Sequence, residues 1–177
     1  MNAKKVYGAV GGEAAGSGFV GPGERVQIED RDRVISLIVD AIGGVLYLML
    51  AEALEEVFEG KRSRDGVART VIMRLPELVW SFAKEACKEL SKDKERLLAE
   101  GIEEFMRLYN TRVRRNAIIN LDDMLEFADD MAIQLVDGNA WPVEDILING
   151  VTENLKQAKK AVREAVKGYL KDHLCPA

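Results

Sequence analysis

Residues 34–51 read VISLIVDAIGGVLYLMLA, and this apolar stretch sets the kind of fold that the chain can adopt. Its one charged side chain is Asp40, and its apolar residues would surround almost the whole circumference of a helix. The stretch is just long enough to span a bilayer, but Asp40 would then lie at mid-membrane, and neither an aromatic belt nor a basic flank follows. We therefore expect a helix that is buried on most sides in a folded protein, and no membrane span.

The rest of the chain predicts further helices around this one. Acidic residues before the stretch and Gly60 after it place the ends of the first helix near residues 30 and 59. No segment of four or more residues alternates in the way of a strand. The predicted fold is an all-α helical bundle of five to seven helices, the later ones at residues 67–74, 77–90, 91–115, 121–136 and 142–174, with Gly150 as a point of interruption in the last.

Glycine placement predicts one close contact and one flexible segment. Gly43 and Gly44 lie in the middle of the first helix, where each costs about 1 kcal/mol of helix propensity. Such a pair indicates a close helix crossing. Residues 8–23 hold seven of the fifteen glycines, a composition that buries too little apolar surface to offset the entropy of ordering. The predicted organisation is a flexible Gly-rich arm at residues 1–28 and a single helical domain at residues 29–177.

Capping residues, a proline and a tryptophan predict where helices begin. Ser91 and Asn120 are natural N-caps, because their side-chain oxygens can accept from the free N–H groups of the first turn. Pro76 predicts a break before the helix at 77–90, since proline is favoured in a first turn. Trp141, directly before Pro142, is expected to pack a helix start against the core.

Composition narrows the chemistry. A formal charge of −5 argues against extensive coating of nucleic acid, although a local basic patch is compatible with it. Cys87 and Cys175 lie far apart and match no zinc or disulfide spacing, so Cys87 is expected to be an inert buried thiol and the protein cytoplasmic. His173 is the only histidine, and its place near the end of the sequence argues against Ser-His or Cys-His catalysis. No metal or cofactor is predicted.

A basic segment is the first candidate site. Residues 107–115, RLYNTRVRR, contain four arginines and no acid, and the turn at 61–66 carries further cations. Brought together, these side chains could bind phosphates through charge-assisted hydrogen bonds without reading bases. The alternative is that the arginines complement the negative end of a helix dipole. The candidate nucleic-acid-binding residues are Lys61, Arg62, Arg64, Arg107, Arg112, Arg114 and Arg115.

Acidic pairs offer an enzymatic alternative. Carboxylates three or four positions apart share one helix face and can hold Mg²⁺. The pairs Glu52/Glu55 and Glu126/Asp129 resemble the E-x-x-E and E-x-x-D motifs of the all-α nucleoside-triphosphate pyrophosphatases of the MazG type, and this resemblance implies Mg²⁺-dependent nucleotide hydrolysis. About seventy residues separate the two pairs here. A solvated helix face is the alternative interpretation.

Residues 75–130 carry a second resemblance. Leu75-Pro76 opens one helix, Ser91 begins a longer one, and the sequence Arg115-Asn116-Ala117-Ile118 leads to Asp122. This arrangement resembles archaeal histone-fold proteins, and the resemblance implies a dimer that wraps DNA. The chain is assigned to neither family.

The pattern as a whole favours a non-enzymatic structural or assembly protein. The first helix is apolar over more of its circumference than one neighbouring helix would cover, so we expect a second subunit to bury part of it. The predicted role is a self-associating helical subunit of a larger particle or nucleoprotein complex. The alternatives are a nucleic-acid backbone-binding protein and a Mg²⁺-dependent nucleotide pyrophosphatase.

Overall fold

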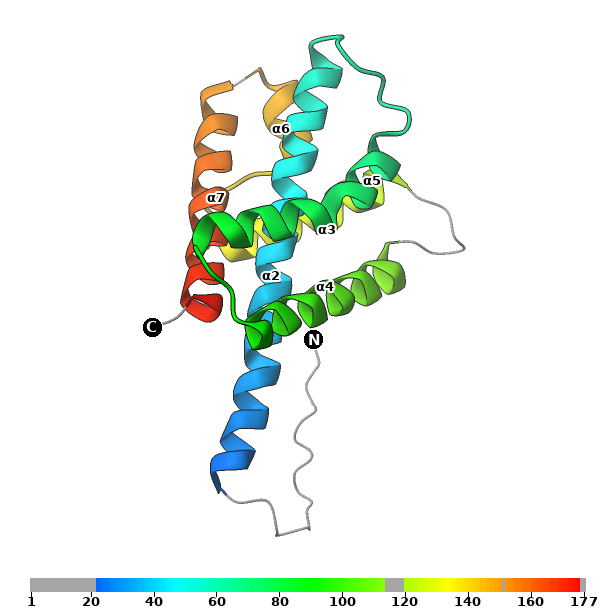
Figure 1. Cartoon of the computed structure of the whole chain (residues 1–177). Helices are drawn as coiled ribbons and strands as arrows, with labels where there is room; N and C mark the ends of the chain where they lie inside the picture. The colour runs from blue at the N-terminus through cyan, green and yellow to red at the C-terminus, as the bar shows by residue number, and fades with distance from the viewer. Residues whose placement is uncertain (1–21, 114–119, 151, 176–177) are drawn as a thin grey trace.

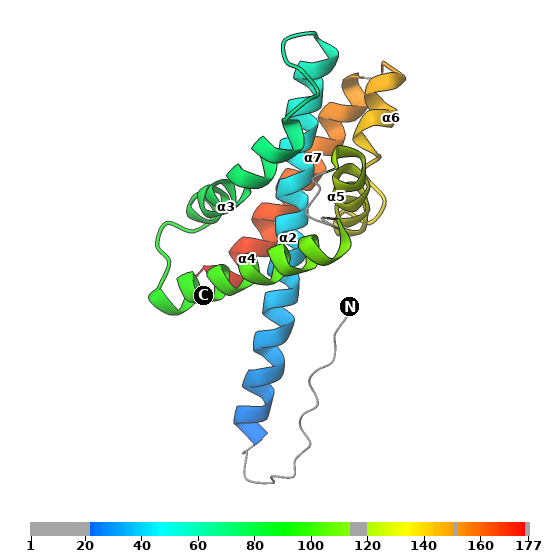
Figure 2. The same cartoon turned by 90° about the vertical axis from the view of Figure 1, so that its right-hand side faces the viewer.

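The computed structural model describes residues 22–113, 120–150 and 152–175, and they form an all-α bundle (Figures 1 and 2). Within these ranges there are six helices and no strand, which confirms the predicted fold class. The helices are α2 (Pro22–Phe58), α3 (Val67–Ala86), α4 (Lys92–Arg112), α5 (Leu121–Leu135), α6 (Val143–Ile148) and α7 (Thr152–Leu174).

Helix α2 runs through the middle of the bundle, and α3, α4, α5, α6 and α7 all pack on it (Figures 1 and 2). The consecutive residues Val45, Leu46 and Tyr47 are each 0% exposed, which requires neighbours on every side of the helix. The expected burial of this helix is confirmed, and its cover comes from the same chain. The apolar circumference of α2 therefore does not require a second subunit, contrary to the expectation from sequence.

The apolar part of α2 is also long and apolar enough to pass a test for membrane spans that considers length and composition only. The segment Asp30–Phe58 passes that test, but 67% of its most apolar window is buried inside the bundle. A core helix enclosed by its own chain passes the same test, because it needs the same apolar surface.

Close helix crossings occur where glycines allow them. A Cβ added at Gly43 would lie 2.6 Å from the Met131 side chain of α5, and one at Gly44 would lie 2.6 Å from Val166 of α7. The predicted close crossing at this pair is confirmed. Gly101 of α4 makes a third such contact with Ile38 of α2. This contact was not predicted, although an isolated glycine inside a helix is a signal for a close approach.

We expect Gly44→Ala to lower the free energy of unfolding by about 1–3 kcal/mol, the usual cost of overpacking. The added methyl group would lie 2.6 Å from Val166 and 2.8 Å from Leu135, which outweighs the gain in helix propensity. Gly168→Ala is the matched control, because nothing lies within 4 Å of its added Cβ, and it should gain roughly 0.5–1 kcal/mol. Urea unfolding measures the stability of both variants, and a Gly44→Ala variant stabilised as much as Gly168→Ala would contradict the close crossing at Gly44.

Proline does not break α3 where a break was predicted. The helix runs without interruption from Val67 to Ala86 with Pro76 inside it. The prediction of two helices is wrong because the buried residues Val71, Leu75 and Val79 continue the packed face across the proline. This packing outweighs the missing N–H and the ring clash that proline brings to a helix interior.

The predicted helix starts at Ser91 and Asn120 are confirmed. The Ser91 hydroxyl accepts from the N–H of Lys94 at 3.2 Å, and the Asn120 side chain accepts from those of Asp122 and Asp123 at 2.8 and 3.2 Å.

Two other predicted boundaries have different outcomes. A turn with Gly150 at φ +69° separates α6 from α7, as predicted. Helix α2 starts at Pro22, inside the range predicted as the arm, and residues 1–21 lie outside the described residues.

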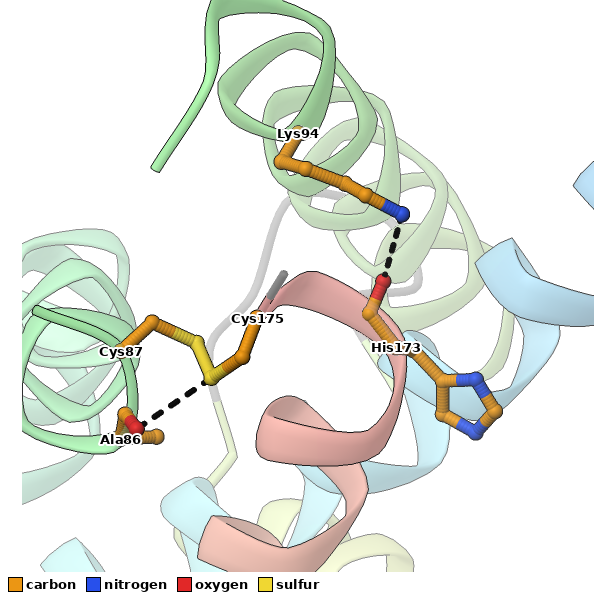
Figure 3. The surroundings of a disulfide bond; sticks show 5 residues. All are labelled: Ala86, Cys87, Lys94, His173 and Cys175. Atoms are coloured by element: carbon orange, nitrogen blue, oxygen red, sulfur yellow. Dashed lines mark hydrogen bonds between the residues drawn. A yellow bond between two sulfur atoms is a disulfide. The ribbon is translucent and has the colours of Figure 1, made fainter. Parts of the chain in front are cut away.

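A disulfide joins the ends of two helices. Cys87 follows α3 and Cys175 follows α7, with their Cα atoms 5.2 Å apart (Figure 3). The predictions of a free Cys87 thiol and of no disulfide framework are wrong, because the pairing depends on how α3 and α7 pack rather than on spacing. The cysteines therefore provide no argument for a reducing compartment.

The end of α7 is held at a second point beside the disulfide. The Lys94 ammonium group of α4 donates to the carbonyl oxygen of His173 at 3.0 Å (Figure 3). A lysine at this place also complements the negative end of the helix dipole. The C-terminal end of α7 is thus fixed to both α3 and α4.

Candidate functional site

The basic turn between α2 and α3 is bound to acids of the same chain. Arg64 donates to Asp122 of α5 at 2.7 Å and to Glu144 of α6 at 2.8 Å. The hydrogen bond to Glu144 is the main reason that the pKa of Arg64 is raised. Arg64 therefore links three parts of the bundle, and its charge is compensated.

The other two cations of the turn are also paired. Arg62 lies 3.4 Å from a carboxylate oxygen of Glu56, and Lys61 lies 3.2 Å from one of Glu59. The Lys61–Glu59 pair is exposed and the Arg62–Glu56 pair is partly exposed, so each stabilises the fold by no more than about 1 kcal/mol. They still reduce the positive potential that the turn presents to a phosphate.

The four arginines of residues 107–115 have different outcomes. The Arg107 guanidinium donates to both carboxylate oxygens of Glu104, with Nε at 3.0 Å from Oε1. Arg112 is exposed in the last turn of α4. Arg114 and Arg115 lie outside the described residues. The ion pairs of the turn lead to α2, α5 and α6, and that of Arg107 stays within α4, so the described contacts do not join the two basic segments.

The acidic pairs do not form a shared site. Glu55 accepts from Lys159 of α7 at 2.6 Å, an interhelical pair at the α2–α7 contact. On α5, Glu126 is exposed whereas Asp129 is buried, so these two carboxylates face different surroundings. Among the described residues no group of three or more His, Cys, Asp or Glu is placed to hold a metal ion.

Asp129 is the one buried charged residue among the described side chains. Its Oδ1 accepts from the backbone N–H of Val143, the first residue of α6, at 3.3 Å. Burial raises the pKa of Asp129 to about 7, the Val143 N–H opposes this, and the nearby carboxylates of Asp130 and Asp145 add to the rise. Asp129 was predicted only as a candidate Mg²⁺ ligand in the pair Glu126/Asp129, because the burial of one carboxylate of such a pair has no local sequence signal.

A tyrosine fastens the loop before α6. The Tyr47 hydroxyl of α2 donates to the carbonyl oxygen of Trp141 at 2.7 Å. Burial, followed by the charge of Asp129, raises the pKa of Tyr47. The Trp141 side chain is 46% exposed, so the prediction that it packs a helix start against the core is wrong. Its backbone carbonyl makes the connection to the core instead.

A cavity of about 480 Å³ lies where α2, α3 and α7 meet. It is lined by apolar and charged side chains from all three helices and from the turn after α2. No local sequence pattern predicted this cavity, because its lining residues come from several segments of the chain.

No family model, curated protein or solved structure matches this chain.

Proposed function

We propose that this protein is a non-enzymatic, self-associating structural subunit that assembles through the exposed N-terminal part of α2. Helix α2 has 37 residues and the next longest, α7, has 23, which corresponds to lengths of about 55 and 35 Å. The first turns of α2 project beyond the bundle in both perpendicular views (Figures 1 and 2). This projection is the observation that carries the proposal.

A projecting helix benefits from a partner. Short isolated helices are marginally stable in water, and most helix stability in proteins comes from packing of one face. Near the bundle, Arg31 is tied to Glu100 of α4 by an ion pair. A second copy that packs on the projecting turns would supply the missing neighbour.

The described side chains at the base of the projection suit such a contact. Asp30, Arg33, Val34 and Leu37 fall three or four positions apart, so they share one helix face. Asp30 and Arg33 are exposed, and Val34 and Leu37 are partly exposed. An antiparallel arrangement of two copies would place opposite charges together around an apolar centre, which is the self-complementary geometry of a two-fold interface.

Light scattering coupled to size-exclusion chromatography tests the proposal with the full chain. We expect a dimer or larger species at micromolar concentration, and Leu37→Asp should shift it to the monomer mass. Ile148→Asp is the matched control, since Ile148 is a 69% exposed apolar residue at the end of α6, and it should keep the wild-type mass. A monomer for the wild type at every concentration would refute self-association.

The same chromatography shows whether nucleic acid belongs to the assembly. In the basic segment at residues 107–115, Arg107 is bound to Glu104, and Arg112 is exposed in the last turn of α4. If that segment binds phosphates, replacing Arg112, Arg114 and Arg115 by alanine should weaken a complex with DNA or RNA and flatten its salt dependence. Masses unchanged by nucleic acid at low salt would restrict the proposal to protein–protein assembly.

A further inference from the structure

The cavity between α2, α3 and α7 has a packed apolar floor. Leu48, Ala53, Val71 and Phe82 line it and belong to the buried core, with at most 9% exposure each. Helix α3 crosses α2 and contacts α7 (Figure 1). Residues of all three helices line the space, which is partly open to solvent because Glu52, Arg74 and Arg163 of its lining are exposed. Its volume of about 480 Å³ falls within the roughly 300–1,000 Å³ of small-molecule sites.

Charged side chains stand around this apolar floor, and some of them are already paired. Glu56 pairs with Arg62 at 3.4 Å, and Glu85 pairs with Lys167 at 3.2 Å. The charged lining residues are Glu52, Glu56, Arg62, Arg74, Glu85 and Arg163.

Three charges of the lining remain without a partner among the described residues: Arg74, Arg163 and Glu52. Helices α2 and α7 run antiparallel (Figures 1 and 2), and Glu55 of α2 pairs with Lys159 of α7. One turn further along the same contact lie Glu52 of α2 and Arg163 of α7. Arg74 stands on α3. Two guanidinium groups against one carboxylate leave one positive charge in excess beside the apolar floor.

We propose that this cavity binds an amphipathic monoanion, with its apolar tail on the floor and its carboxylate or similar head group on Arg74 and Arg163. The floor supplies the hydrophobic contribution, which does not depend on the head group. The two guanidinium groups supply selectivity, because they offer charge-assisted hydrogen bonds to an anion and repel a cation. This site does not depend on self-association through α2.

Isothermal titration calorimetry with decanoate and decyltrimethylammonium tests the proposal on the full chain. The two probes share an alkyl tail and differ in the sign of the head group. Decanoate should bind about tenfold more tightly or better, and the double variant Arg74→Gln/Arg163→Gln should lose about tenfold in decanoate affinity. Arg69→Gln is the matched control on the same helix, because Arg69 is exposed and does not line the cavity.

Several results would overturn the proposal. Equal affinity for the two probes, no decanoate binding by the wild type, or an unchanged affinity in the double variant would each do so. A change of assembly mass in the double variant would show that a second copy occupies the cavity instead. The mass of the Leu37→Asp variant separates failure here from failure of the proposed self-association.

Discussion

Cys175→Ser is expected to lower the free energy of unfolding by about 4–5 kcal/mol. The disulfide closes a loop with a sequence separation of 88, and the entropy that such a cross-link removes from the unfolded chain grows with the logarithm of loop length. Without the bridge, the end of α7 loses its covalent link to α3 and keeps the hydrogen bond from Lys94 to the His173 carbonyl oxygen. Urea unfolding of the oxidised proteins measures the difference.

A reducing agent provides the control for this prediction. In dithiothreitol the wild type should fall to the stability of Cys175→Ser, and the variant should not change. A difference below about 1 kcal/mol between the oxidised proteins would show that the bridge adds little to the packing of α3 and α7. Two free thiols in the native wild type, measured without reductant, would contradict the bridge itself.

The parts of the fold that could be predicted depend on local sequence. Asn120 caps α5 through the N–H groups of the next residues, so its role can be read within one turn. The apolar circumference of α2 predicted that it would be surrounded, and Gly43 and Gly44 marked two places where neighbours approach closely. What the sequence could not show was that the same chain covers the buried part of α2, from Ile38 to Leu54.

The parts that could not be predicted depend on contacts between distant segments. Pro76 is compatible with a continuous α3 only because the helix packs on both sides of it, and Cys87 meets Cys175 only because α3 packs against α7. Local propensity is a weak prior that such packing overrides.

The ion pairs of the candidate basic site could not be predicted either, because they also join distant segments. Arg64 was predicted to be available to phosphates, but its partners Asp122 and Glu144 lie 58 and 80 positions away in the sequence. The sequence shows how many cations a segment contains, whereas only the fold shows which of them are paired with acids of the same chain. The cavity between α2, α3 and α7 was unpredictable for the same reason.

Asp129→Asn is expected to raise the free energy of unfolding at pH 8 by up to about 4 kcal/mol, which is the free energy that corresponds to a rise of the pKa from 3.8 to about 7. At that pH the wild type holds a buried carboxylate, and burial is the main cause that raises its pKa to about 7. Asparagine has no charge to desolvate, and its side-chain oxygen can still accept from the Val143 N–H.

The pH dependence of stability follows from the same shift. The pKa of Asp129 in the folded protein, about 7, lies above the ordinary 3.8, so between these values the folded protein holds a proton that the unfolded chain has released. Stability therefore falls as the pH rises from about 4 to about 7, and it levels off above that range. Asp40, whose pKa burial raises to about 6, contributes in the same direction.

Urea unfolding of the wild type and of Asp129→Asn at several values between pH 5 and pH 8 measures this dependence. The variant should lose most of the slope and keep the part that Asp40 contributes. Asp130→Asn is the matched control, because Asp130 is the exposed neighbour and acts on Asp129 only through its charge; it should give a smaller change of the same sign. A variant that is less stable than the wild type at pH 8 would show that the buried carboxylate contributes more through its hydrogen bond to α6 than its desolvation costs.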